Sequence, residues 1–154
     1  MPDWSIGVLA VVAALAAAGL VGLAWRRRNG AMREVAAPSP RDGGPPPVAA
    51  EVLEDLGVRL GVPATLLQFS SAFCAPCRAT RRICAEVEGM LDGVRHVDVD
   101  AEAHLDAVRA LDVRRTPALL VIDAHGRVVR RASGQPTKSQ VIAAVAPLLE
   151  SAPR

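Results

Sequence analysis

The stretch Phe73-Cys74-Ala75-Pro76-Cys77-Arg78 places two cysteines three residues apart, between an apolar run and an arginine-rich helical pattern. The apolar run, Ala64 to Phe69, predicts a strand, and Pro76 to about Met90 predicts a helix. Two thiols at such a strand–turn–helix are close enough to form a reversible disulfide. The spacing therefore indicates either redox or metal chemistry.

The predicted helix favours redox chemistry. Cys74 would lie at the helix N-terminus, where free backbone N–H groups and the helix dipole lower a thiol pKa and favour the reactive thiolate. Arg78, one turn along, adds a positive charge nearby. Cys77 would be more buried and could resolve the mixed disulfide that Cys74 forms. Pro76 suits the first turn because its missing N–H would be unpaired there anyway.

A zinc site is the main alternative for such a pair. Zinc needs four ligands, usually from two separated pairs. Cys84 lies seven residues after Cys77 on the same predicted helix, and no histidine has a ligand spacing from these cysteines. We therefore expect no metal. A purely structural disulfide is also disfavoured, since so short a loop hardly constrains the unfolded chain. Cys84 is expected to be a buried small residue, with a regulatory thiol as the alternative.

The N-terminal segment predicts a membrane span over residues 4–25. Trp4 to Trp25 carries no charge, and as a helix it covers roughly 33 Å, enough for a hydrocarbon core of about 30 Å. A core helix of this length would need a polar face, and a signal peptide would carry positive charge before the apolar run. Here the basic residues follow the run, at Arg26, Arg27, Arg28 and Arg33. The positive-inside rule then predicts a single-pass cell-membrane protein with its N-terminus outside and its domain in the cytoplasm.

Residues 26–49 are expected to be a linker, first basic and then rich in proline and glycine. Such a run cannot bury an apolar face, and its prolines favour extended conformations. We expect a stalk that holds a domain of residues 50–154 off the membrane. A ligand for a proline-recognising module is the alternative.

Charge excludes one class of partner. Residues 51–154 carry 13 Arg or Lys and 13 Asp or Glu, so the net charge of +2 comes from residues 1–50. We therefore expect the domain to bind no nucleic acid. Two arginine pairs, Arg81-Arg82 and Arg114-Arg115, are expected to be solvated, or to attract an acidic partner.

Residues 50–154 predict an α/β domain with a mixed sheet, because strands crossed by helices are followed by a hairpin and a last helix. A Thr137–Gln140 capping box opens that last helix, and Pro147 is expected to kink or stop it. Thr116-Pro117 precedes the third strand, where a cis bond would expose backbone for pairing with an incoming peptide. The predicted helices are 51–60, 76–90, 101–111 and one from 137, and the predicted strands are 65–70, 94–99, 118–122 and 127–131.

These features together resemble the thioredoxin family over roughly Ala50 to Leu149. The matching pieces are the cysteine turn after Leu67-Gln68-Phe69, then Val97-Asp98-Val99-Asp100, Leu111 to Pro117, and Gly134. The resemblance implies a thioredoxin-like three-layer sandwich with a mixed β-sheet. It also implies thiol–disulfide exchange without a cofactor, with Cys74 as nucleophile and Cys77 as resolver. Substrate contacts are expected at Phe73, Ala75, Pro76, Thr116 and a cis Pro117.

The sequence departs from the family pattern at three places. Phe73 replaces the usual tryptophan before the first cysteine, and Ala75-Pro76 replaces the Gly-Pro of thioredoxins proper. Gln68 stands where many members have a buried acid that moves the proton of the resolving cysteine. Because Gln68 cannot titrate, water or His96 would have to accept that proton.

The leading expectation is a membrane-tethered disulfide reductase. Its partners would be a disulfide-containing protein and a reductase that donates electrons, because a cytoplasmic domain meets reducing conditions. One alternative places the domain outside the membrane, in oxidative folding or cytochrome thiol maintenance. Another is a redox-inert docking module, which would have no need of the Cys74/Cys77 pair.

Overall fold

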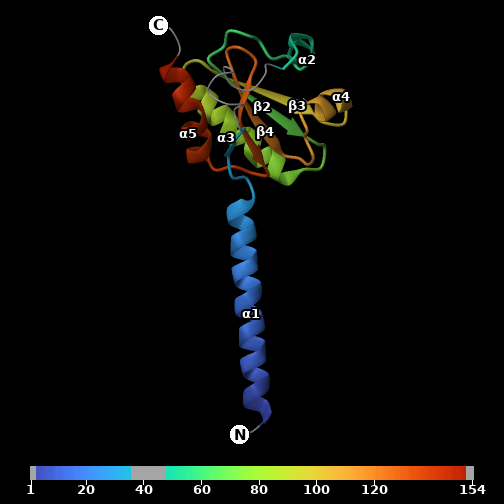
Figure 1. Ribbon diagram of the computed structural model, residues 1–154, viewed down its shortest axis with the longest axis vertical. Helices are drawn as coiled ribbons and strands as arrows, with labels where there is room; N and C mark the ends of the chain where they lie inside the picture. Colours follow the sequence, from blue (N-terminus) through green and yellow to red (C-terminus); the bar gives the residue numbers. More distant parts are fainter. Residues whose placement is uncertain (1–2, 36–47, 152–154) are drawn as a thin grey trace.

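A computed structural model describes residues 3–35 and 48–151. A mixed five-stranded sheet carries helices on both faces, and one long helix leaves the domain at one end (Figure 1). This is the expected three-layer α/β fold. The helices are α1 (Asp3–Arg28), α2 (Ala50–Asp55), α3 (Ala75–Met90), α4 (Leu105–Ala110) and α5 (Lys138–Glu150). The strands are β1 (Arg33–Glu34), β2 (Ala64–Ser70), β3 (Val94–Asp100), β4 (Ala118–Asp123) and β5 (Val128–Ser133).

The strand order β1-β5-β4-β2-β3 brings three chain segments to one end of the sheet. β2 runs parallel to β3 and antiparallel to β4, and β4 and β5 form an antiparallel hairpin. Phe69 near the end of β2 pairs with Val99 on one side and with Ala118, the first residue of β4, on the other. The turns that follow β2 and precede β4 therefore lie side by side.

Two apolar cores hold the layers together. Every residue of β2 is buried, as expected for a central strand covered on both faces. Alternate residues of β2 and β4 pack against α2 and α4 on one face and against α3 and α5 on the other. The first core includes Leu53, Leu67, Phe69, Ala107, Leu120 and Ile122, and the second includes Leu66, Cys84, Val87, Leu119, Val121, Val141 and Val145.

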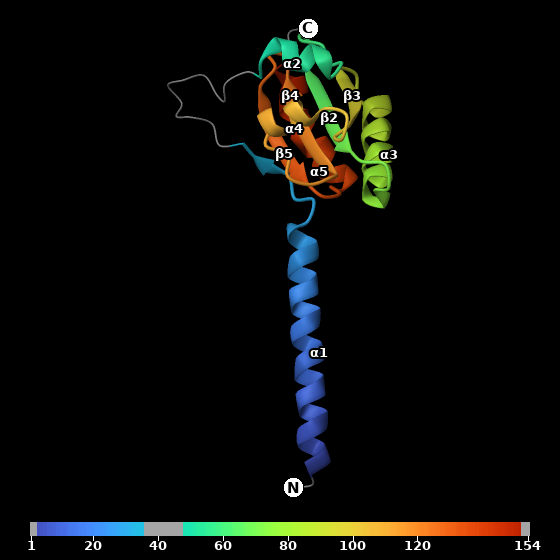
Figure 2. The same ribbon diagram turned by 90° about the vertical axis from the view of Figure 1, so that its right-hand side faces the viewer.

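α1 is long and apolar enough to cross a membrane. Its segment Gly7–Trp25 has a mean hydropathy of 2.4, and none of it is buried against the domain. This exposure excludes a core helix, whereas a signal sequence near the N-terminus would have the same length and composition. Figure 2 shows α1 projecting from the sheet domain as a separate rod.

The chain after α1 joins the domain, which differs from the expected linker. Gly30 N–H donates to the Ser133 carbonyl at 2.8 Å, and β1 pairs with the edge strand β5 in antiparallel register. Glu34 also forms an ion pair with Arg130 at 2.6 Å. Residues 29–35 therefore belong to the folded domain rather than to a stalk. The proline- and glycine-rich part of the expected linker, residues 36–47, lies outside the described residues.

Several element boundaries also differ from the predicted ones. α4 begins at Leu105 rather than residue 101, because the Asp100 side chain accepts the Glu102 N–H at 2.9 Å in a preceding turn. α2 stops at Asp55, before a glycine with φ of +76°. β5 spans residues 128–133 rather than 127–131. α5 has the predicted capping box but continues through Pro147 to Glu150, so, of the expected kink or stop at this proline, the stop is wrong. Only a single turn follows the proline, so few helical bonds are at stake.

Candidate active site

The two cysteines of the opening stretch form a disulfide at the start of α3. Their Cα atoms are 5.2 Å apart, and the Cys77 N–H donates to Cys74 Sγ at 3.1 Å. Cys74 is the N-cap residue of α3, and a proline follows in the first turn. Cys77 is buried, whereas Cys74 is half-buried. Once the disulfide is reduced, the helix N-terminus and this N–H would stabilise a thiolate on Cys74.

The loop before β4 lies against the cysteine turn. The Thr116–Pro117 peptide bond is cis. The hydroxyls of Thr116 and Ser71, three residues before Cys74, are 3.1 Å apart, and the Pro117 carbonyl accepts the Gly134 N–H at 2.8 Å. The structure thus brings the two predicted parts of the site together from residues more than forty positions apart.

The residues predicted to contact substrate surround the disulfide with different exposure. Phe73, Ala75 and Pro76 are exposed, and Phe73 is fully so. Thr116 is half-buried and Pro117 is buried. A fully exposed aromatic ring beside a disulfide offers apolar surface to a partner.

Gln68 supports Cys77 from the sheet without carrying charge. It is fully buried, and its Nε2 donates to the Cys77 carbonyl at 2.9 Å and to Ser70 Oγ at 2.8 Å. Its Oε1 lies 3.3 Å from His96 Nε2, which places the His96 proton on that nitrogen. Since both amide donors and the carbonyl are used, the glutamine is satisfied as a neutral group.

A chain of polar contacts continues from Gln68 to the protein surface. The Ser70 hydroxyl donates to Asp98 Oδ1 at 2.5 Å. Arg81 Nε donates to Asp98 Oδ2 at 2.7 Å, and a second guanidinium nitrogen also contacts this oxygen. Ser70 and Asp98 were not among the predicted site residues, and Arg81 was expected to be solvated or to attract an acidic partner. The parallel register groups them, because Gln68 pairs with Asp98 and the two side chains share a face of the sheet.

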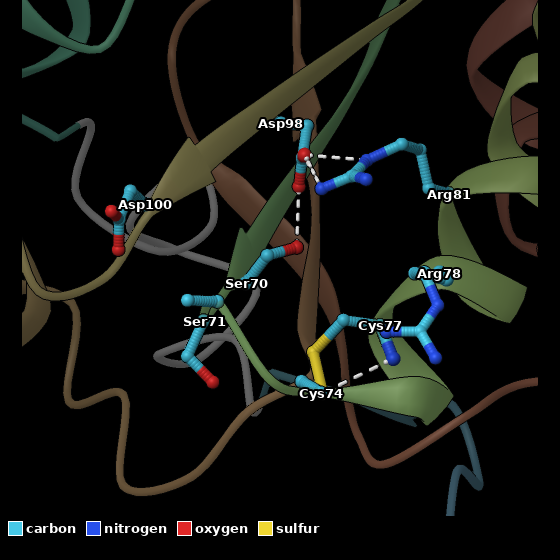
Figure 3. Close-up of a pocket in the computed structure, with 9 residues that line it drawn as sticks. Ser70, Ser71, Cys74, Cys77, Arg78, Arg81, Asp98 and Asp100 are labelled. Carbon is cyan, nitrogen blue, oxygen red and sulfur yellow. Dashed lines mark hydrogen bonds and ion pairs between the residues drawn. A yellow bond between two sulfur atoms is a disulfide. The ribbon is translucent and has the colours of Figure 1, made fainter.

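Ser70, Arg81 and Asp98 line a pocket of about 200 Å³ beside the disulfide. Figure 3 shows Ser70 and Asp98 on the sheet side of the pocket, Cys74 and Cys77 at its base, and Arg78 and Arg81 on α3. The predicted proximity of Arg78 to Cys74 agrees with this arrangement. The pocket gives Cys77 a polar surrounding that includes a carboxylate. The lining residues are Ser70, Ser71, Ala72, Cys74, Cys77, Arg78, Arg81, Asp98 and Asp100.

Two other candidates lie away from this pocket. His96 contacts Gln68 from the far side, and burial lowers its pKa, which the nearby Asp98 charge only partly opposes. Cys84 is fully buried in the core shared by α3 and α5, as predicted. Burial, together with the charges of Asp98 and Glu88, raises the pKa of the Cys84 thiol to about 12, so this thiol stays protonated.

Comparison with known proteins identifies the family. The thioredoxin family model matches residues 58–147, more than half of the chain. The chain belongs to the thioredoxin family. A thioredoxin domain with a CxxC-spaced cysteine pair supports thiol–disulfide oxidoreductase activity at the general level.

Solved thioredoxins share this fold at low sequence identity. A mutant thioredoxin of Halobacterium salinarum is 19% identical with a TM-score of 0.57, over 70% of this chain and 90% of that one. Chloroplastic thioredoxin z is 21% identical with a TM-score of 0.55, over 70% and 96%. Mitochondrial thioredoxin 3 of Saccharomyces cerevisiae is 14% identical with a TM-score of 0.52, over 64% and 88%. Comparison with curated proteins gives no significant match.

Proposed function

We propose that the chain is a membrane-anchored thiol–disulfide oxidoreductase that reduces disulfides of a protein partner through Cys74 and Cys77. The observation that carries this proposal is the Cys74–Cys77 disulfide at the start of α3, beside the Thr116–Pro117 loop. A redox-inert docking module would need neither cysteine.

The reaction begins from the dithiol form of the site. The Cys74 thiolate attacks one sulfur of the substrate disulfide, which forms a mixed disulfide and releases the other substrate sulfur as a thiolate. Cys77 then loses its proton and attacks Cys74 Sγ, which breaks the mixed disulfide and releases the second substrate thiolate. The substrate gains two electrons, and the protein is left with the Cys74–Cys77 disulfide. A reductase that donates electrons through its own dithiol would restore the starting form.

Asp98 is the proposed acceptor of the Cys77 proton. It lines the same pocket as Cys77, and Ser70 already donates a hydrogen bond to it. His96 is less suited, because its Nε2 proton points to Gln68 and Gln68 stands between it and Cys77. A proton that crosses the pocket to Asp98 can leave to solvent, because the Asp98 side chain is 23% exposed.

The exposed rim of the site would bind the partner. Phe73, Ala75 and Pro76 offer an apolar surface next to Cys74. Thr116, held in this loop by the cis bond to Pro117, would offer its backbone on the opposite side of the disulfide, where an extended peptide could pair with it. α1 would hold this rim at the cytoplasmic face of the membrane, where reducing conditions favour the dithiol form.

Insulin reduction by the full chain in detergent tests the oxidoreductase function. We expect the wild type to precipitate insulin in the presence of dithiothreitol well above the uncatalysed rate, and Cys74→Ser to lose this acceleration. Cys84→Ser serves as the matched control, because Cys84 lies outside the pocket. Equal rates for the wild type and Cys74→Ser would exclude the proposed activity and favour the docking module.

A further inference from the structure

The end of α1 lies at the active-site end of the domain. Gly30, two residues after α1, donates to Ser133, and the neighbouring Gly134 donates to the carbonyl of Pro117. Two backbone hydrogen bonds of 2.8 Å therefore connect the chain leaving the helix to the cis-proline loop. Figures 1 and 2 agree, because α1 leaves the domain on the side where α3 begins.

The junction between α1 and the domain, residues 29–30 against residues 133–135, is tightly packed. A Cβ atom on Gly30 would come 1.9 Å from the Gln135 carbonyl oxygen, and one on Gly134 would come 2.2 Å from Asn29 Oδ1. Arg33 then pairs with Arg131 in the sheet. At the helical rise, Arg28 lies only roughly 5 Å beyond Trp25. A membrane that contains α1 up to Trp25 would therefore lie close to the Thr116–Pro117 loop.

The surface between the junction and this loop is strongly basic. A depression of about 380 Å³ is lined by four arginines with Ala31 and Ser133. We call these four, Arg33, Arg114, Arg115 and Arg131, the arginine face. Arg115 donates to the Ser133 carbonyl and Arg131 donates to the Asp112 carbonyl. Among the described residues, only one carboxylate, that of Asp112, pairs with an arginine of this face, Arg114 at 3.0 Å.

We propose that the arginine face lies on anionic lipid headgroups, so that the Cys74–Cys77 site faces the bilayer and acts on disulfides held close to the membrane surface. The inference rests on the proposed function and its membrane anchor. Lipid is favoured over an acidic protein segment because α1 itself places these arginines at the headgroup level, where basic residues bind anionic lipids. The substrate class is then a disulfide in a segment of a membrane protein that adjoins the bilayer.

Thiol protection in defined membranes tests this orientation. The full chain with Cys77→Ser would be placed in nanodiscs rich in phosphatidylglycerol, in nanodiscs of phosphatidylcholine and in detergent. Labelling of Cys74 by a maleimide bearing a long polyethylene glycol chain is compared with labelling by N-ethylmaleimide, which corrects for changes in thiol reactivity. We expect the bulky reagent to be slowed about five-fold or more in the phosphatidylglycerol nanodiscs, because headgroup contact brings the site to the surface.

A cysteine at the other end of the domain provides the control. The control chain carries His125→Cys together with Cys74→Ser and Cys77→Ser. Position 125 is in the exposed turn between β4 and β5, one strand length from Pro117. It should be labelled equally in all three environments. Cys84 contributes no signal, because it is buried with a raised pKa. Equal labelling of Cys74 in all three environments would overturn the proposal, and equal protection in phosphatidylcholine would overturn the role of anionic headgroups.

Two variants separate the arginine face from the tether. Arg33→Gln with Arg131→Gln should reduce the protection in phosphatidylglycerol, whereas Arg59→Gln with Arg95→Gln, at the opposite end of the domain, should not. A flexible Gly/Ser insertion between Arg28 and Asn29 should weaken the protection but leave insulin reduction in detergent unchanged. Insulin reduction without protection of Cys74 would remove the membrane orientation and keep the oxidoreductase function. Protection of Cys74 without insulin reduction would keep the membrane orientation and remove the oxidoreductase function.

Discussion

At the scale of single residues, Gln68 changes how the resolving cysteine is supported. A buried carboxylate at this position would titrate beneath Cys77, whereas the amide holds the Cys77 carbonyl and the Ser70 hydroxyl with fixed donors. In the proposed mechanism the carboxylate is that of Asp98, which lies farther along the same polar chain. The proton of Cys77 would therefore leave through the pocket rather than through the sheet.

Asp98→Asn should slow the second half of the reaction. Asparagine keeps the shape but cannot accept a proton, so the mixed disulfide should resolve about ten-fold more slowly, with water replacing part of the roughly 10²–10⁴-fold effect of general bases. Rapid-quench mass measurement of the mixed disulfide follows this step. Asp100→Asn is the matched control, because Asp100 lines the pocket outside the Gln68–Ser70–Asp98 chain. Unchanged resolution in Asp98→Asn would exclude Asp98 as the acceptor.

His96 should make folding stability depend on pH. Burial lowers its pKa in the folded state below the ordinary value of 6.5. The unfolded chain therefore binds the proton more readily, so the free energy of unfolding should decrease as pH falls through about 6.5 and level off below the folded-state pKa. His96→Gln, which keeps an amide donor for Gln68, should have a shallower dependence. Urea unfolding in detergent at several pH values measures this, and parallel curves for the two proteins would contradict the assignment.

Some residues of the site could be predicted from the sequence, and others could not. The cysteines, Arg78 and Thr116-Pro117 could be predicted because local helix physics and motif spacing identify them. Asp98 and Ser70 could not, because their roles depend on which residues β2 and β3 place opposite each other. Strand register is set by the packing of whole faces, so a polar alternation in one strand does not reveal its neighbour.

At the scale of secondary-structure elements, local patterns predicted most of the domain but not β1. Helical periodicity located α3 and α5, and continuous apolar runs located β2 and β4, because these patterns reflect burial in the layers of the domain. Alternation and outward arginines located β3 and β5. β1 consists of Arg33 and Glu34, which have no apolar alternation, and it forms because β5 offers an open edge. The predicted start of α4 is also wrong, because the Asp100 side chain stabilises a turn before the helix begins at Leu105.

Gly134→Ala should weaken the junction between α1 and the domain. Its φ of +94° already costs an alanine about 1–2 kcal/mol. In addition, the new Cβ would approach Asn29 Oδ1 at 2.2 Å. Gly61→Ala, with φ of +86° and no atom within 4 Å, is the control that carries only the backbone strain. Urea unfolding should rank Gly134→Ala as the less stable protein, and equal stabilities would contradict a tight junction.

At the scale of the whole molecule, the sheet domain and α1 form one arrangement. The domain's own charge is balanced, yet four arginines gather where the chain leaves α1. Sequence reasoning found the excess of positive charge in the first fifty residues but not that the sheet brings Arg114, Arg115 and Arg131 to the same place. The fold brings these arginines, which are far apart in the sequence, together as the arginine face.

The predicted topology can be measured in intact cells. With the domain in the cytoplasm, a thiol reagent that cannot cross membranes should label the His125→Cys form of the Cys74→Ser, Cys77→Ser chain only after the cells are permeabilised. The basic residues that follow the apolar run, Arg26, Arg27, Arg28 and Arg33, are the physical reason for this expectation. Labelling of the introduced thiol in intact cells would place the domain outside and support the extracytoplasmic alternative.

In mechanical terms, residues 29–35, which include β1, are the part of the domain that would take up a force applied to α1. A pull on α1 acts first on the Gly30–Ser133 hydrogen bond and then on the two residue pairs that join β1 to β5, Arg33 with Arg131 and Glu34 with Arg130. If these pairs separate while the rest of the sheet stays intact, residues 29–49 become the connection between anchor and domain. Fully extended, a chain of that length spans at most roughly 75 Å. With α1 as the proposed membrane anchor, separation of this two-residue strand would let the site reach up to that distance from the bilayer surface.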